Sequence, residues 1–442
     1  MADIHLTRDL LWAVTRGELP ASVITRIGTQ HLMSLCTTCR QEITAFRKER
    51  TVKDAADYDR AFQLLPAVLA EQIPRLEQAQ RGAARDLAAL LALSREKRVH
   101  KVERARNRFR SAALVRLLVA ESRRQVQADA EEAFHLASLG RLVAHRNPQM
   151  PGAFDLIALA TAEMANASRM LENIRQAEEH FGHARYVITH HGVTDTEILA
   201  RVDKLEGSLR MDQRLFPQAE ELLTRAATLY KVSGDAVETA RALVTLGNLY
   251  FFQDDRERAI ETTTAALRGL TRNRESRLYL CARYNLARYL TEDGQHEAAA
   301  DLLATDADLY REFPEPWTQL RLIWLRGKIA ACRGESEEAE RAFLEARDGF
   351  MVAGIGYDAA MVVVEDLALL YLQQGRTANV KRLAEEILPI FQSQDVHREA
   401  LAALRLFQEA ARQELLTVQT VREYVRYLRE ARTDSSLRFQ PG

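Results

Sequence analysis

Apolar positions recur along this chain at helical spacing, and one arrangement of them returns about every 40 residues. A small residue is followed four positions later by a large one and three positions after that by another small one, as in Ala177, Phe181 and Ala184. Residues spaced in this way lie on one face of a helix. Each copy predicts the second helix of a closely packed pair. The copies begin at Ala130, Ala177, Ala219, Ala259, Ala299, Ala339 and Val380, which are 47, 42, 40, 40, 40 and 41 residues apart.

A second pattern precedes several of these copies and predicts the first helix of each pair. Its clearest example is Leu246-Gly247-Asn248-Leu249-Tyr250, and Leu367-Ala368 with Tyr371 repeats it. Together the two patterns resemble the tetratricopeptide repeat (TPR). The period exceeds the roughly 34 residues of the standard motif and lies near that of HEAT-type arrays, which predicts longer helices or loops. The position-by-position match favours a TPR-like array.

The sequence therefore predicts an all-α fold, a TPR-like α-solenoid of about seven helix pairs over residues 107–393. The ends of such an array need caps, because each pair buries its apolar face only against its neighbours. Within 394–433, the segments Glu399–Arg412 and Val418–Ala431 are predicted capping helices. We expect residues 1–46 to be a separate module, 47–106 a helical connector and 434–442 a flexible tail.

Composition narrows the classes of function. The net charge is −1, so no overall field attracts nucleic acid or an anionic membrane. The chain has no apolar run of roughly 20 residues and no basic start leading into an apolar stretch, which predicts a cytoplasmic protein without membrane contact. No nucleophile-elbow, Walker or His-Glu-x-x-His pattern occurs, so we do not expect an enzyme.

The first 46 residues break the repeat and contain a candidate metal site. Cys36 and Cys39 form a Cys-x-x-Cys pair, which places two sulfurs on one side of a metal ion. His31 lies five residues earlier, and His5 is the only other His or Cys before residue 100. A redox Cys-x-x-Cys normally follows a strand of a βαβ unit, and none is visible here. Spacing alone leaves open whether His31 is a ligand or a solvated helix residue.

The surrounding residues resemble the zinc-finger domains of zinc-binding anti-sigma factors over residues 4–46. The matching positions are His5-Leu6-Thr7 with Asp9 and Leu11, then Gly17-Glu18-Leu19, then His31, Cys36 and Cys39. The resemblance implies that His5, His31, Cys36 and Cys39 bind a structural zinc ion and that a sigma factor is a partner. One departure is that four residues, rather than three, separate His31 from Cys36. Some such factors release their sigma factor on thiol oxidation, so a redox switch and a structural staple both stay open.

The strongest local charge bias lies at residues 95–110, with eight Arg or Lys against two Glu. One interpretation is a patch that binds nucleic acid or an acidic partner. The other is a solvated helix face that leads into the first repeat. The scarcity of aromatic residues for base stacking favours the solvated face.

Particular first-helix positions line the groove of a TPR-like array and predict a binding surface. These positions hold Arg241, Asn248, Asn285, Arg288, Arg321 and Lys328, a mildly basic set with amide groups. Such a groove suits an acidic or C-terminal peptide. The resemblance to carboxylate-clamp repeats is partial, because Asn248 and Asn285 fit whereas the paired lysines do not.

These features predict a regulatory or scaffold protein that binds protein or peptide partners through its array, with a zinc-stabilised, anti-sigma-like head. The alternative is a nucleic-acid-binding regulator that uses the basic run at 95–110.

Overall fold

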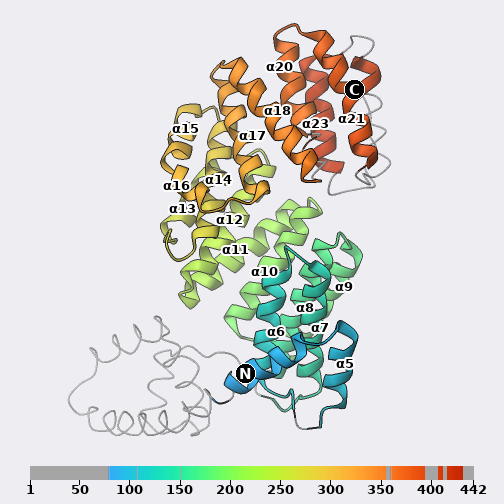
Figure 1. The fold of residues 1–442 in the computed structure, drawn as a ribbon. Coiled ribbons are helices and arrows are strands. Elements are labelled where there is room, and N and C mark those ends of the chain that lie inside the picture. The colour runs from blue at the N-terminus through green and yellow to red at the C-terminus, as the bar shows by residue number, and fades with distance from the viewer. Residues whose placement is uncertain are drawn as a thin grey trace, which may run out of the picture. The chain divides into compact units, whose positions relative to one another are not determined.

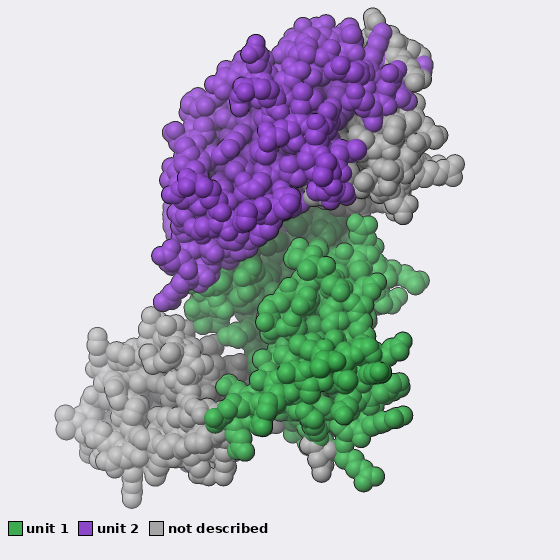
Figure 2. Space-filling view, viewed as in Figure 1, with its two compact units in different colours: residues 1–245 green, residues 246–442 purple. Residues whose placement is uncertain are grey.

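The computed structural model describes residues 78 and 80–431, apart from 107, 151, 355–358, 360, 394–406 and 412–415. Across these residues the chain is helical and contains no strand, which confirms the predicted all-α class. It divides into two compact units, residues 1–245 and 246–442 (Figure 2). None of the described helices is long and apolar enough to cross a membrane.

The first unit is built from successive helix pairs joined by short turns (Figure 1). A helix at 80–91 and α5 (Arg95–Arg104) precede the pairs. The first helix of each pair packs against the first helix of the next, since α8 contacts both α6 and α10. We call the surface formed by these helices the first-helix face. The pairs are α6 (Ala112–Gln125) with α7 (Ala130–His145), α8 (Ala153–Met170) with α9 (Ile174–His191), and α10 (Thr196–Asp212) with α11 (Phe216–Ser233).

Helix α12 (Ala236–Phe252) begins in the first unit and ends in the second, where the same pairing continues. In the last helix pair of the array, the first helix begins as a π-helix, η3, and continues as α20. Helices of the second unit are α13 (Arg256–Arg268), α14 (Ser276–Glu292), α15 (His296–Thr305), α16 (Ala307–Arg311), α17 (Pro316–Cys332), α18 (Ser336–Val352), η3 (Val362–Leu367), α20 (Ala368–Gln373), α21 (Thr377–Ser393) and α23 (Val418–Ala431).

The small anchor residues lie in the second helices, as the sequence predicts, with one correction. Each anchor donates its backbone N–H to the residue four positions earlier, which caps the helix; Ala177 bonds to Asn173 at 3.0 Å and Ala259 to Asp255 at 3.1 Å. In α7 the cap is Asp129, so the anchor is Ala133 rather than the predicted Ala130. Ala133 is fully buried and Ala130 only half-buried. The first interval is therefore 44 residues (177 − 133) instead of 47.

A glycine in the middle of a first helix makes room for the residue four positions after the anchor of the second helix. In the Leu246-Gly247 copy, a Cβ atom on Gly247 would overlap the side chain of Thr263. A Cβ atom on Gly327 would lie 2.8 Å from the ring of Phe343, and one on Gly207 would lie 2.8 Å from Leu223. Both pairs are separated by 16 residues, the distance from the middle of a first helix to the middle of its partner. Close backbone approach thus explains the residue types of both patterns.

Part of the predicted connector belongs to the core of the first unit. Ala83, Leu87, Leu90 and Val102 are buried in the same apolar cluster as α6, α7 and α8. Residues 80–106 therefore pack against the repeats rather than only leading into them. The predicted boundary at residue 46 lies outside the described residues.

The predicted cap covers the end of the second unit. Helix α23 coincides with the second predicted capping helix and contacts η3 and α20. Phe407, from the first predicted capping segment, is fully buried and meets the ring of Tyr424 edge-on at 5.4 Å. This arrangement removes the apolar side of the last repeat from solvent.

Replacing Gly327 with Ala tests the close approach of α17 and α18. The added methyl group overlaps the Phe343 ring, and overpacking of a core typically costs about 1–3 kcal/mol. Gly182→Ala is the matched control, because Gly182 lies in helix α9 with no atom near its Cβ position. We expect urea denaturation to show a loss of stability in Gly327→Ala and a gain of about 0.5–1 kcal/mol in Gly182→Ala. Equal effects would contradict the packing argument.

Candidate functional site

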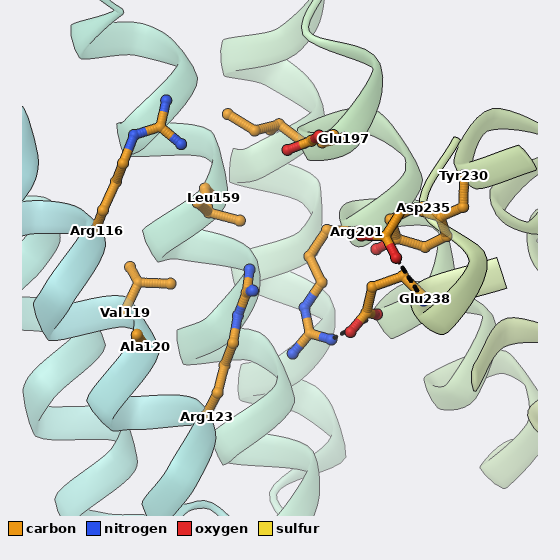
Figure 3. A pocket seen from close by; sticks show the side chains of 11 residues that line it. Arg116, Val119, Ala120, Arg123, Leu159, Glu197, Arg201, Tyr230, Asp235 and Glu238 are labelled. Atoms are coloured by element: carbon orange, nitrogen blue, oxygen red, sulfur yellow. Dashed lines mark hydrogen bonds and ion pairs between the residues drawn. The ribbon is translucent and has the colours of Figure 1, made fainter. Parts of the chain in front are cut away.

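A pocket of about 170 Å³ opens among the first helices of the first unit (Figure 3). Helix α6 contributes Arg116 and Arg123, and α10 contributes Glu197 and Arg201. The capping residue of α12, Asp235, lines the side opposite α6, together with Glu238. Apolar contacts come from Val119, Leu159 and Ile198.

Glu163 of α8 forms the centre of a buried ion network beside this pocket. Its side chain is 1% exposed. One carboxylate oxygen accepts from Arg123 Nε at 2.6 Å and from Arg201 Nε at 2.8 Å, and the other accepts from Arg201 Nη2 at 3.1 Å. Burial opposes the charged form of Glu163, but attraction to Arg201 and Arg123 outweighs it and lowers the pKa to about 2. The carboxylate is therefore ionised, and it ties α6 and α10 to α8.

The network extends to the start of α12 through a lysine. Lys204 Nζ lies 2.7 Å from Glu238 Oε2, and Arg201 Nη1 lies 4.0 Å from the same oxygen. Burial, together with repulsion from Arg201, lowers the pKa of Lys204 to about 7. Burial opposes ionisation of Glu238 as well, but Lys204 and Arg201 lower its pKa to about 2. The carboxylate thus keeps its charge, and the amine of Lys204 is held less firmly in its cationic form than an exposed lysine.

Three charged groups at the pocket take no part in this network. Arg116, Glu197 and Asp235 form no ion pair with any residue in the described part of the chain. Burial, with the neighbouring charges of Asp195 and Asp235, raises the pKa of Glu197. The pocket therefore presents a cation from α6 and carboxylates from α10 and α12 to a ligand.

No motif in the sequence predicts this site. Its one local signal is Glu163, a single carboxylate in the small and apolar run Ala158–Ala167 of α8. A charge in such a run must be paired when the helix is buried. The sequence alone does not say that its partners are Arg123 and Arg201, each about 40 residues away.

The residues of the predicted groove lie on first helices, and Arg288 and Asn248 contact each other. Asn248 Oδ1 accepts from Arg288 Nη2 at 3.1 Å and from the hydroxyl of Tyr289 at 2.6 Å. The guanidinium carbon of Arg288 lies 4.4 Å from the centroid of the Phe251 ring. Asn285 is half-buried on α14. Arg241, in the first unit, pairs with Glu238 at 3.1 Å.

Arg321 is also held on an aromatic ring. Its guanidinium carbon lies 4.3 Å from the centroid of Trp317, which is 44% exposed. Neither Arg321 nor Arg288 forms an ion pair with a carboxylate among the described residues. Both guanidinium groups are thus oriented by rings rather than by a carboxylate of the described residues.

Lys328, by contrast, is surrounded by carboxylates. Its Nζ atom lies 2.7 Å from Glu365, 3.0 Å from Asp366 and 3.7 Å from Glu292. Trp324 Nε1 donates to Asp366 at 2.5 Å. Burial raises the pKa of Asp366 to about 6. Arg288 and Arg321 therefore have no carboxylate partner among the described residues, whereas Arg241 and Lys328 are both paired with carboxylates.

The basic run is used in part for internal contacts. Arg95 bonds to Asp129, Glu131 and Glu132, and Arg98 is buried, where it bonds to Glu132 and to backbone carbonyls. Arg108 bonds to Asp86 at 2.6 Å. Three of the eight cations in this run thus fasten α5 and its flanking residues to the first unit, and these three are already paired with carboxylates of the chain.

The predicted zinc ligands His5, His31, Cys36 and Cys39 lie outside the described residues. Within the described residues, no group of three or more His, Cys, Asp or Glu side chains is arranged to hold a metal ion.

Comparison with known proteins supports the fold. No family model matches the chain, and no curated protein matches it. A solved structure of a Rap protein complexed with competence and sporulation factor is similar, at 15% identity and a TM-score of 0.56, over 72% of this chain and 87% of that one. The apo form of RapI is similar at 13% identity and a TM-score of 0.53, over 71% and 86%. This likeness confirms the TPR-like helical array and, at such identities, extends no further than the fold.

Glu163→Gln tests the buried network. It leaves Arg123 without a charged partner and Arg201 with only Glu238 at 4.0 Å, and breaking a buried pair costs about 3–5 kcal/mol. We expect the lower end of that range, because Arg123 is partly exposed. Urea denaturation followed by circular dichroism, with hydrogen exchange in α8 and α10, measures the change. Glu178→Gln, in the more exposed Glu178–Arg210 pair, should cost less than about 1 kcal/mol.

The stability that Glu163 contributes to the fold should depend on pH. The folded pKa of Glu163 lies below its ordinary value, so its charge stabilises the fold fully above 4.5, and this contribution is lost as pH falls toward about 2. The stability difference between wild type and Glu163→Gln should therefore be constant above pH 5 and shrink below 4.5. A difference that stays unchanged down to pH 3 would contradict the assignment.

Proposed function

We propose that this chain is a regulatory or scaffold protein that binds an acidic protein or peptide segment through first helices of its TPR-like array. The observation that carries the proposal is the pair of ring-stacked arginines, Arg288 and Arg321, that have no carboxylate partner among the described residues. Both arginines are half-buried, and a guanidinium group held in one orientation without a carboxylate partner is suited to bind an anion.

The chemistry around these arginines suits carboxylates. A guanidinium group binds a carboxylate with two parallel hydrogen bonds, and stacking on a ring reduces the entropy lost when it does so. Asn248 accepts hydrogen bonds from Arg288 and Tyr289 through Oδ1, which leaves its amide nitrogen to donate. The exposed face of Trp317 adds apolar contact beside Arg321. Trp and Arg are the residues that most often dominate binding energy at protein interfaces.

The fold comparison supports a binding role. The Rap structure is a complex with competence and sporulation factor, so a helical array of similar fold binds another molecule. This chain shares the arrangement at 15% identity, and its own ligand is inferred here only from its own side chains.

Binding of an acidic peptide to the full chain tests the proposal. The probe is a fluorescein-labelled octapeptide of alternating Glu and Leu, measured by fluorescence anisotropy. We expect Arg288→Ala and Arg321→Ala each to weaken binding by tenfold or more, because each removes a two-bond contact to a carboxylate. Arg268→Ala is the matched control, since Arg268 is an exposed arginine at the end of the second helix α13. Loss of binding in all three variants, or in none, would refute this assignment.

We further propose that the N-terminal residues form a zinc-stabilised head of the anti-sigma type. The support is the sequence match around His5, His31, Cys36 and Cys39. Four ligands from thiolate and imidazole close a structural zinc site, and metal binding supplies folding free energy to a small module. A sigma factor is the partner that the resemblance implies.

Metal analysis of the purified chain tests the head. We expect one zinc ion per chain by mass spectrometry and none in His5→Ala or Cys39→Ser, because each removes one of four ligands. His100→Ala, which changes the next histidine along the chain, should retain the metal. Metal-free reduced protein would remove the anti-sigma-like head from the proposal, and failure of sigma factors to co-purify would remove only the sigma partner.

The nucleic-acid alternative has less support. Arg95, Arg98 and Arg108 are engaged by carboxylates of the chain itself, which leaves fewer cations for phosphates. Tight DNA or RNA binding with a steep salt dependence that Lys97→Ala flattens would favour it instead.

A further inference from the structure

The pocket in the first unit contains neither Arg288 nor Arg321, the residues proposed to bind an acidic peptide, and its lining carries charges of both signs. Arg116 and Arg123 extend from α6 on one side, while Asp235 and Glu238 lie on the other, with Glu197 at the start of α10 (Figure 3). A purely anionic ligand meets repulsion from the carboxylates, and a purely cationic ligand meets repulsion from the arginines. Only a ligand with both charges is attracted by both sides.

The pocket floor is preorganised. Glu163 and Glu238 already pair with Arg123, Arg201 and Lys204 in the buried network. Since these groups hold one another, a ligand needs no rearrangement of the first helices to bind. The charges left for a ligand are Arg116 on one side and the carboxylates of Glu197 and Asp235 on the other.

The volume of the pocket and the separation of its two charged sides restrict the class of ligand further. A volume of about 170 Å³ is below the roughly 300–1,000 Å³ of sites for drug-sized molecules, so the pocket accommodates a single residue. The cationic side belongs to α6 and the acidic side to α10 and α12, with α8 between them. Neighbouring packed helices are about 8–10 Å apart, so the axes of two helices on either side of α8 lie up to about twice that distance apart, and side chains from both span part of it. The α-amino and α-carboxyl groups of one residue share a carbon atom and are too close together, whereas a lysine or arginine side chain places its cation several bonds from the carboxylate.

We propose that this pocket binds a lysine or arginine residue with a free α-carboxylate, either as the free amino acid or as the C-terminal residue of a peptide. The carboxylate faces Arg116, and the basic side chain faces Glu197 and Asp235. The site lies in the first unit and uses none of the residues assigned to acidic-peptide binding, so each proposal stands without the other.

Isothermal titration calorimetry on the full chain tests this with four probes. They are Gly-Gly-Arg with a free carboxylate, the same tripeptide as its C-terminal amide, Gly-Gly-Ala, and free L-arginine. We expect Gly-Gly-Arg to bind at least tenfold more tightly than the amide and than Gly-Gly-Ala, since each of these lacks one charge. If L-arginine binds as tightly as Gly-Gly-Arg, the ligand is the amino acid; if the tripeptide binds more tightly, the ligand is a peptide end.

Single substitutions test which pocket residue recognises each charge of the ligand. Arg116→Ala should abolish the preference for the free acid over the amide, and Glu197→Gln should reduce the preference for Arg over Ala at least fivefold. Arg124→Ala, on the same helix but outside the pocket, should leave both preferences unchanged. Arg116 is exposed, so its variant should fold normally, which circular dichroism and unchanged binding of the acidic octapeptide would verify.

Two results would overturn the proposal. One is that the four probes bind equally or not at all to wild-type protein. The other is that Arg116→Ala and Glu197→Gln, both folded, retain the wild-type preferences. Neither result bears on Arg288 and Arg321, whose role is decided by the octapeptide alone.

Discussion

The carboxylate of Glu163, shared by Arg123 and Arg201, is the interaction on which the first unit depends. Apolar burial brings α6, α8 and α10 together, but it is non-directional and would tolerate sliding of one helix along another. A buried carboxylate that must bond to two guanidinium groups tolerates far less, because an unpaired charge in this position costs several kcal/mol. The three side chains therefore fix the axial register of three successive first helices.

Similar polar bonds recur between neighbouring first helices elsewhere in the chain. Lys204 bonds to Glu238 at 2.7 Å between α10 and α12. In the second unit Arg288 bonds to Asn248 between α14 and α12, and Lys328 bonds to Glu365 between α17 and η3. Neighbouring first helices are thus joined by polar side-chain bonds as well as by apolar packing. These links also decide which charges a ligand can use, since a lysine surrounded by three carboxylates offers little attraction to an anion.

The charged residues proposed to bind ligands at the two candidate sites differ from those of the buried network and from Lys328 in having no ion-pair partner among the described residues. Arg288 and Arg321 are held by rings, which orient a guanidinium group without cancelling its charge. Arg116 and Glu197 form no ion pair within the described part of the chain and are not members of the buried network. The proposed anion-binding residues of the second unit are thus ring-stacked arginines, whereas the proposed site of the first unit is a small pocket with opposite charges on its two sides.

The sequence by itself determined the helical array, because the small-large-small pattern is local and each copy repeats the packing requirement of the last. It also predicted the capping helix α23, because the end of such an array needs a cover for its last apolar face. It placed the first anchor at Ala130 instead of Ala133, since two alanines share the helix and only the cap at Asp129 distinguishes them. It placed the groove residues on first helices but did not determine their charge state. Only the tertiary structure decided that Lys328 is neutralised, that Arg288 and Arg321 are not, and that residues from 116 to 238 form a pocket. Ion pairing depends on side chains about 40 residues apart that no local pattern relates.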